Sequence, residues 1–400
     1  MVEYNQQKCE VIAMINGYKN IVNIGVNDYN LDLFEGQYIV PNGMAYNSYV
    51  ILDDKAVVFD TVDKAHTEKW MANLACALNG MALDYIIVQH MEPDHSGSLF
   101  VALNTYPEAK IVASARAFGM ITQFTGVTIA EDKKIVVKDG SSLCLGEHNL
   151  QFYTAPMVHW PEVIMTFDST SGVLFSADAF GKFGATDADE AWACEARRYY
   201  FNIVGKYGVQ VLAILKKLAD LPVATICPLH GPVLTENLGY YLDLYTTWAS
   251  YKPEARKVFI AYSSVYGNTK GAAELLYNTL KELEVPVAIS DLARSDFAEN
   301  VEDAFKCSHM VLASTTYDNG IFPIMEEFLM HIASKNYANR SVAIIENGTW
   351  APMVGKLIKA KLDTMSNIEF VADTITIKSA LTSANIDQIK KLAETLKASV

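Results

Sequence analysis

The chain has 400 residues, of which 51% are hydrophobic and 20% charged, and this length predicts two or three domains with ordinary cores. Such a composition excludes extended disorder, because disordered chains are poor in apolar residues. The 32 Lys and Arg against 46 Asp and Glu give a net charge of −14, which argues against a nonspecific nucleic-acid binder, since phosphate contacts need a basic face.

Two features of the sequence indicate where in the cell the protein is found. No stretch approaches the roughly 20 apolar residues of a membrane span, and the polar residues 1–7 do not begin a signal peptide. The six cysteines are scattered and form no C-x-x-C pair, which excludes a thiolate metal domain and indicates reduced thiols. We therefore expect a soluble cytoplasmic protein.

The first part of the chain is predicted to contain many short strands and a few helices. β-Branched and apolar runs predict strands at 49–52, 56–59, 85–89, 111–113, 135–137, 151–154, 163–167, 172–175 and 224–226. Apolar residues at helical spacing predict helices over 66–78, most of 189–218 and 237–250. Residues 251–254, Tyr-Lys-Pro-Glu, are typical of a linker.

Regular alternation of strands and helices follows this linker. Strands are predicted at 257–261, 287–291, 310–314, 341–346 and 370–373, and helices over 269–283, 301–306, 324–334, 354–362 and 386–398. Such alternation is typical of a doubly wound parallel sheet. The predicted fold class is therefore α/β, with an α+β front domain over residues 1–252 and a second domain over residues 253–400.

The strongest chemical signal is a group of potential metal ligands directly after the strand at 85–89. These are His90, Glu92, Asp94 and His95. Three more candidates each follow a predicted strand, namely His159, Asp178 and His230. Four imidazoles and three carboxylates could hold two metal ions, and Asp178 could bridge them. The alternative is a set of unrelated polar loop residues, which is the interpretation we favour for the other histidines.

Polar loops also follow three strands of the second predicted domain. The first contains Ser263, Ser264, Val265, Tyr266, Gly267, Asn268 and Thr269 and opens a helix. The second contains Ser314, Thr315, Thr316, Tyr317, Asp318, Asn319 and Gly320, and the third Asn347, Gly348, Thr349 and Trp350. Hydroxyls and N–H groups at a helix N-terminus form an anion site. The first loop has neither a P-loop lysine nor G-x-G-x-x-G, so nucleoside triphosphates and dinucleotides are not indicated.

The metal motif resembles that of the metallo-β-lactamase superfamily, whose hydrolases usually carry His at the third position and bind zinc. Here Glu92 stands at that position, and the glutamate variant resembles the flavodiiron proteins (A-type flavoproteins). The later polar loops resemble those of flavodoxins, so the resemblance covers nearly the whole chain. It implies a metallo-β-lactamase-like αββα sandwich followed by a flavodoxin-like five-stranded parallel sheet. One departure is Ala-Pro-Met after Trp350, where many members have a glycine-rich loop.

The resemblance also implies an activity, the reduction of O2 to water, of NO to N2O, or of both, with FMN and two non-haem irons as cofactors. It assigns His90, Glu92 and His159 to one iron, Asp94, His95 and His230 to the other, and Asp178 to the bridge. His95 does not ligate iron in some relatives. The implied assembly is a head-to-tail homodimer or a pair of such dimers, with Trp350 near the junction. Electrons would come from a separate donor such as rubredoxin.

Three alternatives remain open at this point. A dizinc hydrolase of the same fold would use a metal-bound hydroxide, although Glu92 and the second domain count against it. An electron carrier with a metal-free front domain conflicts with seven intact ligand positions. A flavin-dependent sensor is the third. The preference between O2 and NO, the donor, and the choice of dimer or tetramer are not determined by the sequence. Tyr317 and Trp350 could also simply cover the edge of the sheet.

Overall fold

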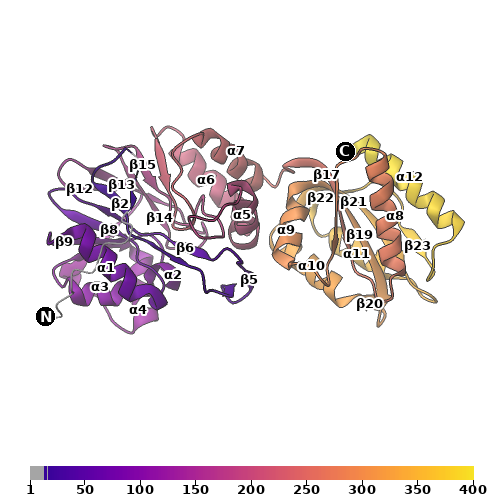
Figure 1. Ribbon diagram of the computed structural model, residues 1–400, viewed down its shortest axis with the longest axis horizontal. Coiled ribbons are helices and arrows are strands. Elements are labelled where there is room, and N and C mark those ends of the chain that lie inside the picture. Colours follow the sequence, from indigo (N-terminus) through magenta and orange to yellow (C-terminus); the bar gives the residue numbers. More distant parts are fainter. Residues whose placement is uncertain (1–12, 16) are drawn as a thin grey trace. The chain divides into compact units, whose positions relative to one another are not determined.

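The computed structural model describes residues 13–15 and 17–400 and contains two compact units (Figure 1). The first comprises the described part of Met1–Tyr199 with Val209–Tyr245, and the second comprises Tyr200–Gly208 with Thr246–Val400. The N-terminal residues 1–7 and Cys9 lie outside the described residues. The domain boundary between residues 252 and 253 stays a prediction. Within the described ranges, no helix has both the length and the apolar character that crossing a bilayer requires.

Two sheets face each other in the first unit. The first sheet has the order β1 (Ala13–Met14), β2 (Ile21–Asn23), β7 (Tyr49–Ile51), β8 (Ala56–Phe59), β9 (Leu83–Val88), β10 (Lys110–Ser114) and β11 (Lys134–Val137). The second has the order β12 (Ser142–Cys144), β13 (Asn149–Thr154), β14 (Ile164–Asp168), β15 (Val173–Phe175) and β16 (Thr225–Cys227). Strands β8 to β11 are parallel, and so are β15 and β16.

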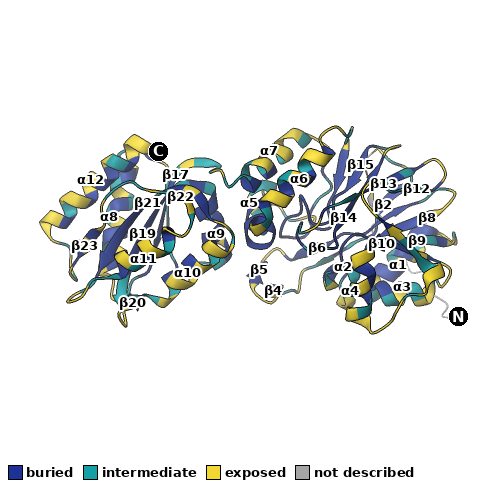
Figure 2. Cartoon of the chain, turned by 180° about the vertical axis from the view of Figure 1, so that it is seen from behind, coloured by how far each residue is buried: buried dark blue, intermediate teal, exposed yellow. Residues whose placement is uncertain are grey.

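Helices cover the sandwich on its outer sides (Figure 1). In chain order they are α1 (Thr67–Leu78), α2 (Pro93–Ser96), α3 (Leu99–Thr105), α4 (Ala115–Thr125), α5 (Trp192–Tyr199), α6 (Gly208–Leu218) and α7 (Leu238–Ala249). Between the sheets lies an apolar core to which both contribute, with Phe59 and Phe175 stacked at 3.9 Å between ring centroids. Figure 2 shows these strands as buried and the outward helix faces as exposed. The predicted sandwich is confirmed.

Two short antiparallel strand pairs lie beside the sandwich. One pairs β3 (Val26–Asp28) with β6 (Met44–Tyr46), and the other pairs β4 (Leu33–Phe34) with β5 (Tyr38–Ile39). The sequence did not predict them, because strands of two or three residues carry too little alternation to recognise. Both matter for the site described below, since they place Phe34 and Ala45 against His230.

The second unit is a parallel sheet wound on both faces. Its order is β18 (Val287–Asp291), β17 (Ala255–Tyr262), β19 (Cys307–Tyr317), β21 (Ala338–Asn347) and β22 (Ser366–Phe370). This is the flavodoxin-like order 2-1-3-4-5, so the predicted fold is confirmed. Two short additions are β20 (Gly320–Ile321), antiparallel to β19, and β23 (Ile375–Ile377), parallel to β21.

Five helices flank this sheet. They are α8 (Asn268–Glu282), α9 (Phe297–Lys306), α10 (Pro323–Ser334), α11 (Val354–Leu362) and α12 (Ser383–Ser399). Apolar residues of α8 and α12 pack on one face of the sheet, and α9, α10 and α11 lie on the other (Figures 1 and 2). The carboxyl ends of the parallel strands are therefore left free to form a site.

Two sequence expectations were wrong. The strand predicted at 370–373 falls on the break between β22 and β23, which occupy successive lengths of the same sheet edge. The expectation of reduced thiols fails for Cys76, which is disulfide-bonded. Cys144, Cys194, Cys227 and Cys307 form no disulfide. Scattered spacing therefore did not exclude a disulfide in this chain.

A buried histidine–aspartate pair joins the turn before β13 to the end of β14. His148 Nδ1 lies 2.6 Å from Asp168 Oδ2, and the Ser171 hydroxyl donates to the same carboxylate. The hydrogen bond to Asp168 raises the pKa of His148 despite burial. Burial would raise the pKa of Asp168, but hydrogen bonds from His148 and Ser171 outweigh it and lower that pKa.

This pair predicts a pH-dependent stability. A histidine pKa raised by folding stabilises the protein fully below its unfolded value of about 6.5, and this contribution disappears as pH rises through the folded-state pKa. We expect wild type to melt above His148→Gln by a margin that is largest near about pH 6 and shrinks toward about pH 9. Thermal melts followed by circular dichroism measure this margin, and a margin independent of pH would contradict it.

Candidate metal centre and cofactor pocket

The ends of four strands place the predicted ligands in one region of the first unit. Strand β9 ends just before His90, and Asp94 and His95 lie in α2, whose first residue is Pro93. Proline suits this position because its fixed φ matches the helix and its missing N–H would have no partner there. The result is a short, stiff segment that presents both side chains.

The other three ligands follow strands of the second sheet. Strand β14 is antiparallel to both β13 and β15, and β16 is parallel to β15. Strands β13, β15 and β16 therefore run in the same direction and end at the same edge. His159, Asp178 and His230 come after these three ends, which is why residues so far apart in sequence meet.

The structure brings all seven predicted side chains together as two groups. His90, Glu92, His159 and Asp178 form one group, and Asp94, His95 and His230 form the other. Within each group the potential ligand atoms lie within 4.8 Å of one another. His95, the ligand that the resemblance left least secure, belongs to the second group, with Nε2 3.0 Å from His230 Nε2.

Asp178 lies between the two groups and turns one oxygen toward each. Its Oδ2 is 3.0 Å from His159 Nε2 and 3.4 Å from His90 Nε2. Its Oδ1 is 3.2 Å from His95 Nε2 and 3.8 Å from His230 Nε2. Because a carboxylate can bind two cations through its two oxygens, this is the arrangement that a bridging ligand needs.

Two imidazoles have their other nitrogen held by a hydrogen-bond acceptor. His90 Nδ1 is 2.8 Å from Glu162 Oε1, which also accepts from the Met91 N–H at 2.8 Å. His230 Nδ1 is 2.7 Å from the Ala45 carbonyl oxygen, which can only accept. The Nδ1 proton is therefore assigned in His230, and in the neutral ring the lone pair is on Nε2, which lies 3.0 Å from His95 Nε2 and 3.4 Å from Asp94 Oδ2. Such partners fix the tautomer of a metal-binding histidine.

The buried oxygens of the site have too few donors within the protein. Both carboxylate oxygens of Asp94 are buried without a hydrogen-bond partner, and Oδ1 of Asp178 forms no hydrogen bond although His95 Nε2 lies 3.2 Å away. An unpaired buried carboxylate is costly unless it binds a cation.

Burial raises the pKa of Asp94 to about 7 and lowers that of His230 to about 4. Burial also opposes the charged form of His159, but Asp178 and Glu92 outweigh it and raise that pKa to about 9. The donor set fits two divalent metal ions, whose binding would displace these protons.

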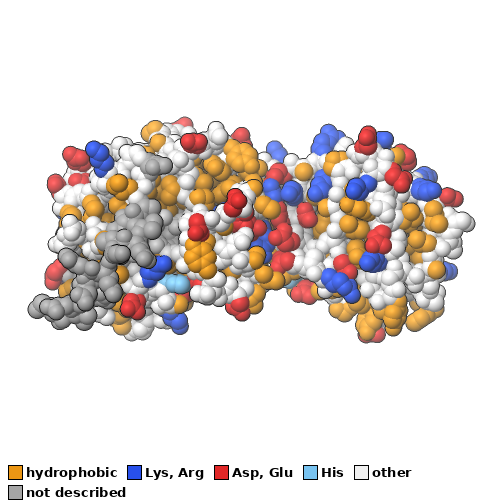
Figure 3. All heavy atoms as spheres, viewed as in Figure 1, with side chains coloured by type: hydrophobic (Ala, Val, Ile, Leu, Met, Phe, Trp, Pro, Cys, Tyr) orange, Lys and Arg blue, Asp and Glu red, His pale blue; other side chains and the backbone are white. Residues whose placement is uncertain are grey.

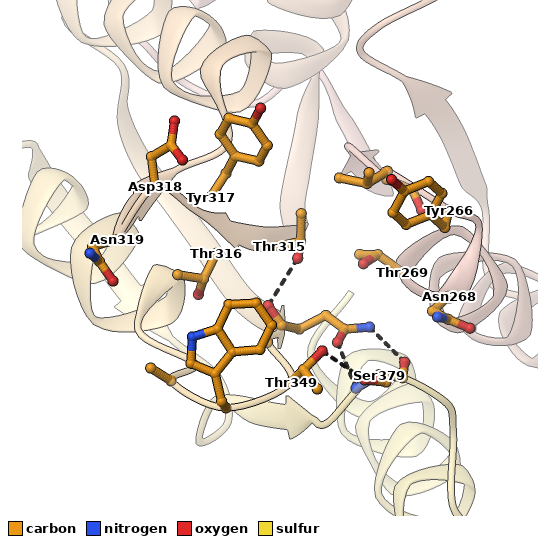
Figure 4. Close-up of a pocket in the computed structure, with 16 residues that line it drawn as sticks. Tyr266, Asn268, Thr269, Thr315, Thr316, Tyr317, Asp318, Asn319, Thr349 and Ser379 are labelled. Atoms are coloured by element: carbon orange, nitrogen blue, oxygen red, sulfur yellow. Dashed lines mark hydrogen bonds between the residues drawn. The ribbon is translucent and has the colours of Figure 1, made fainter.

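The cofactor-sized cavity lies in the second unit, at the carboxyl ends of β17, β19 and β21. It measures about 520 Å³, within the usual range for small-molecule sites. Figure 4 shows Tyr266 and Thr269 on one side of it and Thr316 on the other. No side chain caps the N-terminus of α8, so its first N–H groups are available to a phosphate. This cavity fits a flavin mononucleotide.

Most of the predicted flavin-loop residues line this cavity. They are Ser264, Val265, Tyr266, Asn268, Thr269, Thr315, Thr316, Tyr317, Asp318, Asn319, Asn347, Gly348, Thr349 and Trp350. The remaining four do not. Ser263 and Ser314 are buried beneath it and hydrogen-bond each other at 2.9 Å, Gly267 is the N-cap of α8, and Gly320 pairs with Tyr317.

The third loop folds back on itself in the region where this chain departs from the glycine-rich pattern. A Cβ at Gly348 would meet the Pro352 Cα at 2.8 Å, so only glycine fits there. The Thr316 hydroxyl accepts from the Met353 and Val354 N–H groups at 3.0 and 3.1 Å. The second flavin loop therefore fixes the start of α11 and, with it, the loop that carries Trp350.

Two more cavity residues, Ala351 and Ser379, were not predicted. Asn347 Nδ2 donates to the Ser379 carbonyl at 2.9 Å, and the Ser379 N–H donates to Asn347 Oδ1 at 3.0 Å (Figure 4). Ser379 follows β23, which the sequence placed too early, so its position at a strand end was missed.

Glu162 in the metal centre was also missed, because its partner His90 lies 72 positions earlier and no local pattern links them.

Comparisons with known proteins agree with both sites. A family model described as ODP family beta lactamase matches residues 44–231. The rubredoxin-oxygen oxidoreductase of Megalodesulfovibrio gigas is 27% identical over 386 residues, which cover 93% of this chain and 94% of that protein. The anaerobic nitric oxide reductase flavorubredoxin of Citrobacter koseri is 30% identical over 345 residues, which cover 83% of this chain and 71% of the relative.

A solved structure shows the same likeness over both units. The rubredoxin oxygen:oxidoreductase of Desulfovibrio gigas has a TM-score of 0.88 at 26% identity, covering 96% of this chain and 98% of that one. The fold and sites thus define a metallo-β-lactamase-like oxidoreductase with a flavodoxin-like unit. The chain belongs to the flavodiiron protein family, whose cofactors are FMN and a non-haem di-iron site. These relatives favour the oxidoreductase over the dizinc hydrolase and over a carrier without activity.

The contact between Glu162 and His90 generates a prediction on metal affinity. In Glu162→Ala both the His90 ring and the Met91 N–H lose their acceptor, and we expect ferrous iron to bind about 10- to 100-fold more weakly. Glu162→Gln is the matched control, because its amide oxygen can still accept from both groups, and its loss should be smaller. Anaerobic titration with ferrous iron measures both, and wild-type affinity in Glu162→Ala would refute the assignment.

Proposed function

We propose that this protein reduces O2 to water, two NO to N2O, or both, in the cytoplasm, with electrons that reach its FMN from a separate soluble donor of the rubredoxin class. The observation that carries the proposal is Asp178, whose two oxygens face two separate groups of ligands. A pair of metal ions is the arrangement that this geometry supports best. The rubredoxin-oxygen oxidoreductase and the NO reductase flavorubredoxin named among the relatives support the two substrates.

In this proposal each ligand group holds one iron. The first iron is held by His90, Glu92 and His159, the second by Asp94, His95 and His230, and Asp178 binds both. Glu92 distinguishes the site from that of the zinc hydrolases, because a carboxylate adds negative charge and hardness that favour iron. Glu162 and the Ala45 carbonyl hold the His90 and His230 rings in place.

The electron count fits both reactions. When bound, reduced FMN and two ferrous ions supply two and two electrons. Reduction of O2 to two waters takes four electrons and four protons, and reduction of two NO to N2O and one water takes two of each. The N-terminus of α8 would bind the FMN phosphate, and the second and third loops would flank the isoalloxazine ring.

Gas consumption by the reconstituted protein tests the proposed activity. Protein loaded anaerobically with ferrous iron and FMN, and reduced chemically, should consume O2 or NO catalytically, as followed with selective electrodes. Protein loaded with zinc is the matched control. Its reduced flavin reacts with O2 only to give H2O2, so it should form no water from O2 and consume no NO. Absence of turnover with both gases in protein that holds two irons and one FMN would refute the proposal.

The assembly we propose is a homodimer in which the flavin pocket of one chain lies against the metal unit of the other. Tyr266 and Trp350 at the rim of the cavity are 93% and 89% exposed, and Val265 and Tyr317 are 44% and 46% exposed. Figure 3 shows hydrophobic side chains gathered at this end of the second unit, near β20. Large aromatic side chains on one exposed patch are typical of an interface. A pair of such dimers would use the same contact.

Truncation of the two most exposed aromatic residues tests this contact. We expect the double variant Tyr266→Ala, Trp350→Ala to weaken dimerisation by about 30-fold or more, since buried aromatic anchors dominate interface energies. Met330→Ala is the control, because Met330 is 58% exposed on α10 of the second unit and does not line the cavity. Analytical ultracentrifugation over a concentration series measures the dissociation constants. Unchanged dimerisation with full FMN loading in the double variant would refute the interface.

A further inference from the structure

Asn47 binds the backbone on both sides of His230. It is 2% exposed, and its Nδ2 donates to the carbonyl oxygens of Pro228 at 2.9 Å and Gly231 at 2.7 Å. Its own backbone N–H donates to the Leu229 carbonyl at 2.8 Å. Three of the four carbonyl groups over residues 228–231 are therefore bonded to this one residue, and the fourth belongs to His230 itself.

Residues close to Asn47 in the sequence contact the same loop. Ala45, two residues earlier, accepts from His230 Nδ1 at 2.7 Å, and the Tyr49 hydroxyl, two residues later, donates to the Pro228 carbonyl at 2.7 Å. Segment 45–49 thus contacts both the ring and the backbone of this histidine. On the other side of the loop, the Leu229 N–H donates to the Ala177 carbonyl at 2.9 Å, next to Asp178.

The Asn47 amide is well suited to hold such a loop. Its two Nδ2 hydrogens satisfy two carbonyls, and its Oδ1 accepts from Asn23 Nδ2 at 3.2 Å, so the amide orientation is determined. Gly231 has a φ of 78°, a left-handed conformation that ends the loop sharply. Without the Asn47 amide the Gly231 carbonyl would lose its donor, and the Pro228 carbonyl would keep only the Tyr49 hydroxyl. An unpaired buried backbone group favours rearrangement of its segment.

We propose that Asn47 is a positioning residue for the metal ligand His230 and sets the affinity of the second metal ion, held by Asp94, His95 and His230. This inference rests on the proposed function, because it needs a metal at that group. The His230 side chain can reach its position opposite His95 only if the backbone at 228–231 keeps its present conformation. The hydrogen bonds of Asn47 fix this conformation, although Asn47 does not itself contact the ligand atoms.

Ferrous-iron binding tests this role. Wild type, Asn47→Ala and Asn73→Ala are purified as full chains and titrated anaerobically with ferrous iron. Asn73→Ala is the matched control, because the Asn73 amide also donates to two carbonyls, those of Ile24 and Gly25, but not in the His230 loop. We expect one of the two ions to bind about 10- to 100-fold more weakly in Asn47→Ala, with both ions bound normally in Asn73→Ala.

Melting temperatures separate positioning from general destabilisation. Both variants can melt below wild type without metal, but only Asn47→Ala should lose part of the increase that ferrous iron gives. If Asn47→Ala does not fold, Asn47→Asp replaces it, since an ionised aspartate keeps the size and loses both donors. Its added negative charge alone would strengthen cation binding, so weaker binding would report the lost hydrogen bonds.

The outcomes are distinct. Wild type that binds fewer than two ferrous ions would overturn the proposed function, and this inference with it. Wild type that binds two ions, together with unchanged affinities in Asn47→Ala or Asn47→Asp, would overturn the positioning role alone. Equal weakening in Asn73→Ala would also overturn it, because the effect would then be general to lost amide contacts in this unit.

Discussion

The seven ligand side chains of the first unit, six of them buried and Glu92 half-buried, carry more lone pairs and negative charge than the protein around them can satisfy. Both oxygens of Asp94 and Oδ1 of Asp178 form no hydrogen bond within the described fold, and His230 Nδ1 is bound to the Ala45 carbonyl oxygen. Such a cluster costs free energy in a folded protein unless cations neutralise it. Folding and metal binding are therefore coupled at this site. The two sheets of the sandwich hold its ligands in position.

The sheets can hold these ligands together because strand direction brings residues that are distant in sequence to one edge. Strands β9, β13, β15 and β16 each end just before a ligand or its loop, and the loops then turn toward one another. The second unit applies the same rule, since three parallel strands end in polar loops around one cavity. In both units the sheet supplies rigidity, and the loops after the strands supply the chemistry. Contacts such as those of Glu162, Asn47 and Thr316 then restrict the loops to one conformation.

Most of this architecture could be predicted from the sequence because its signals are local. The alternation after residue 254 gives the doubly wound sheet, and the segment from His90 to His95 gives four of the seven metal ligands. What the sequence could not supply are partners that depend on three-dimensional packing. Glu162 and Asn47 are an ordinary acid and an ordinary amide until the fold places them beside His90 and the His230 loop. Ser379 was missed for a different reason, because the last strand is divided in two and its real end lies later in the chain.

Metal content per chain is the measurement that tests the central claim most directly. Protein purified without oxygen and loaded with ferrous iron should hold two irons per chain by mass spectrometry, and replacement of Asp178 by alanine should lower that number, because Asp178 faces each group with one oxygen. Two irons in wild type and fewer in Asp178→Ala is the result predicted here. Stable binding of zinc with no retention of iron, or an iron content that Asp178→Ala leaves unchanged, would contradict a shared di-iron site.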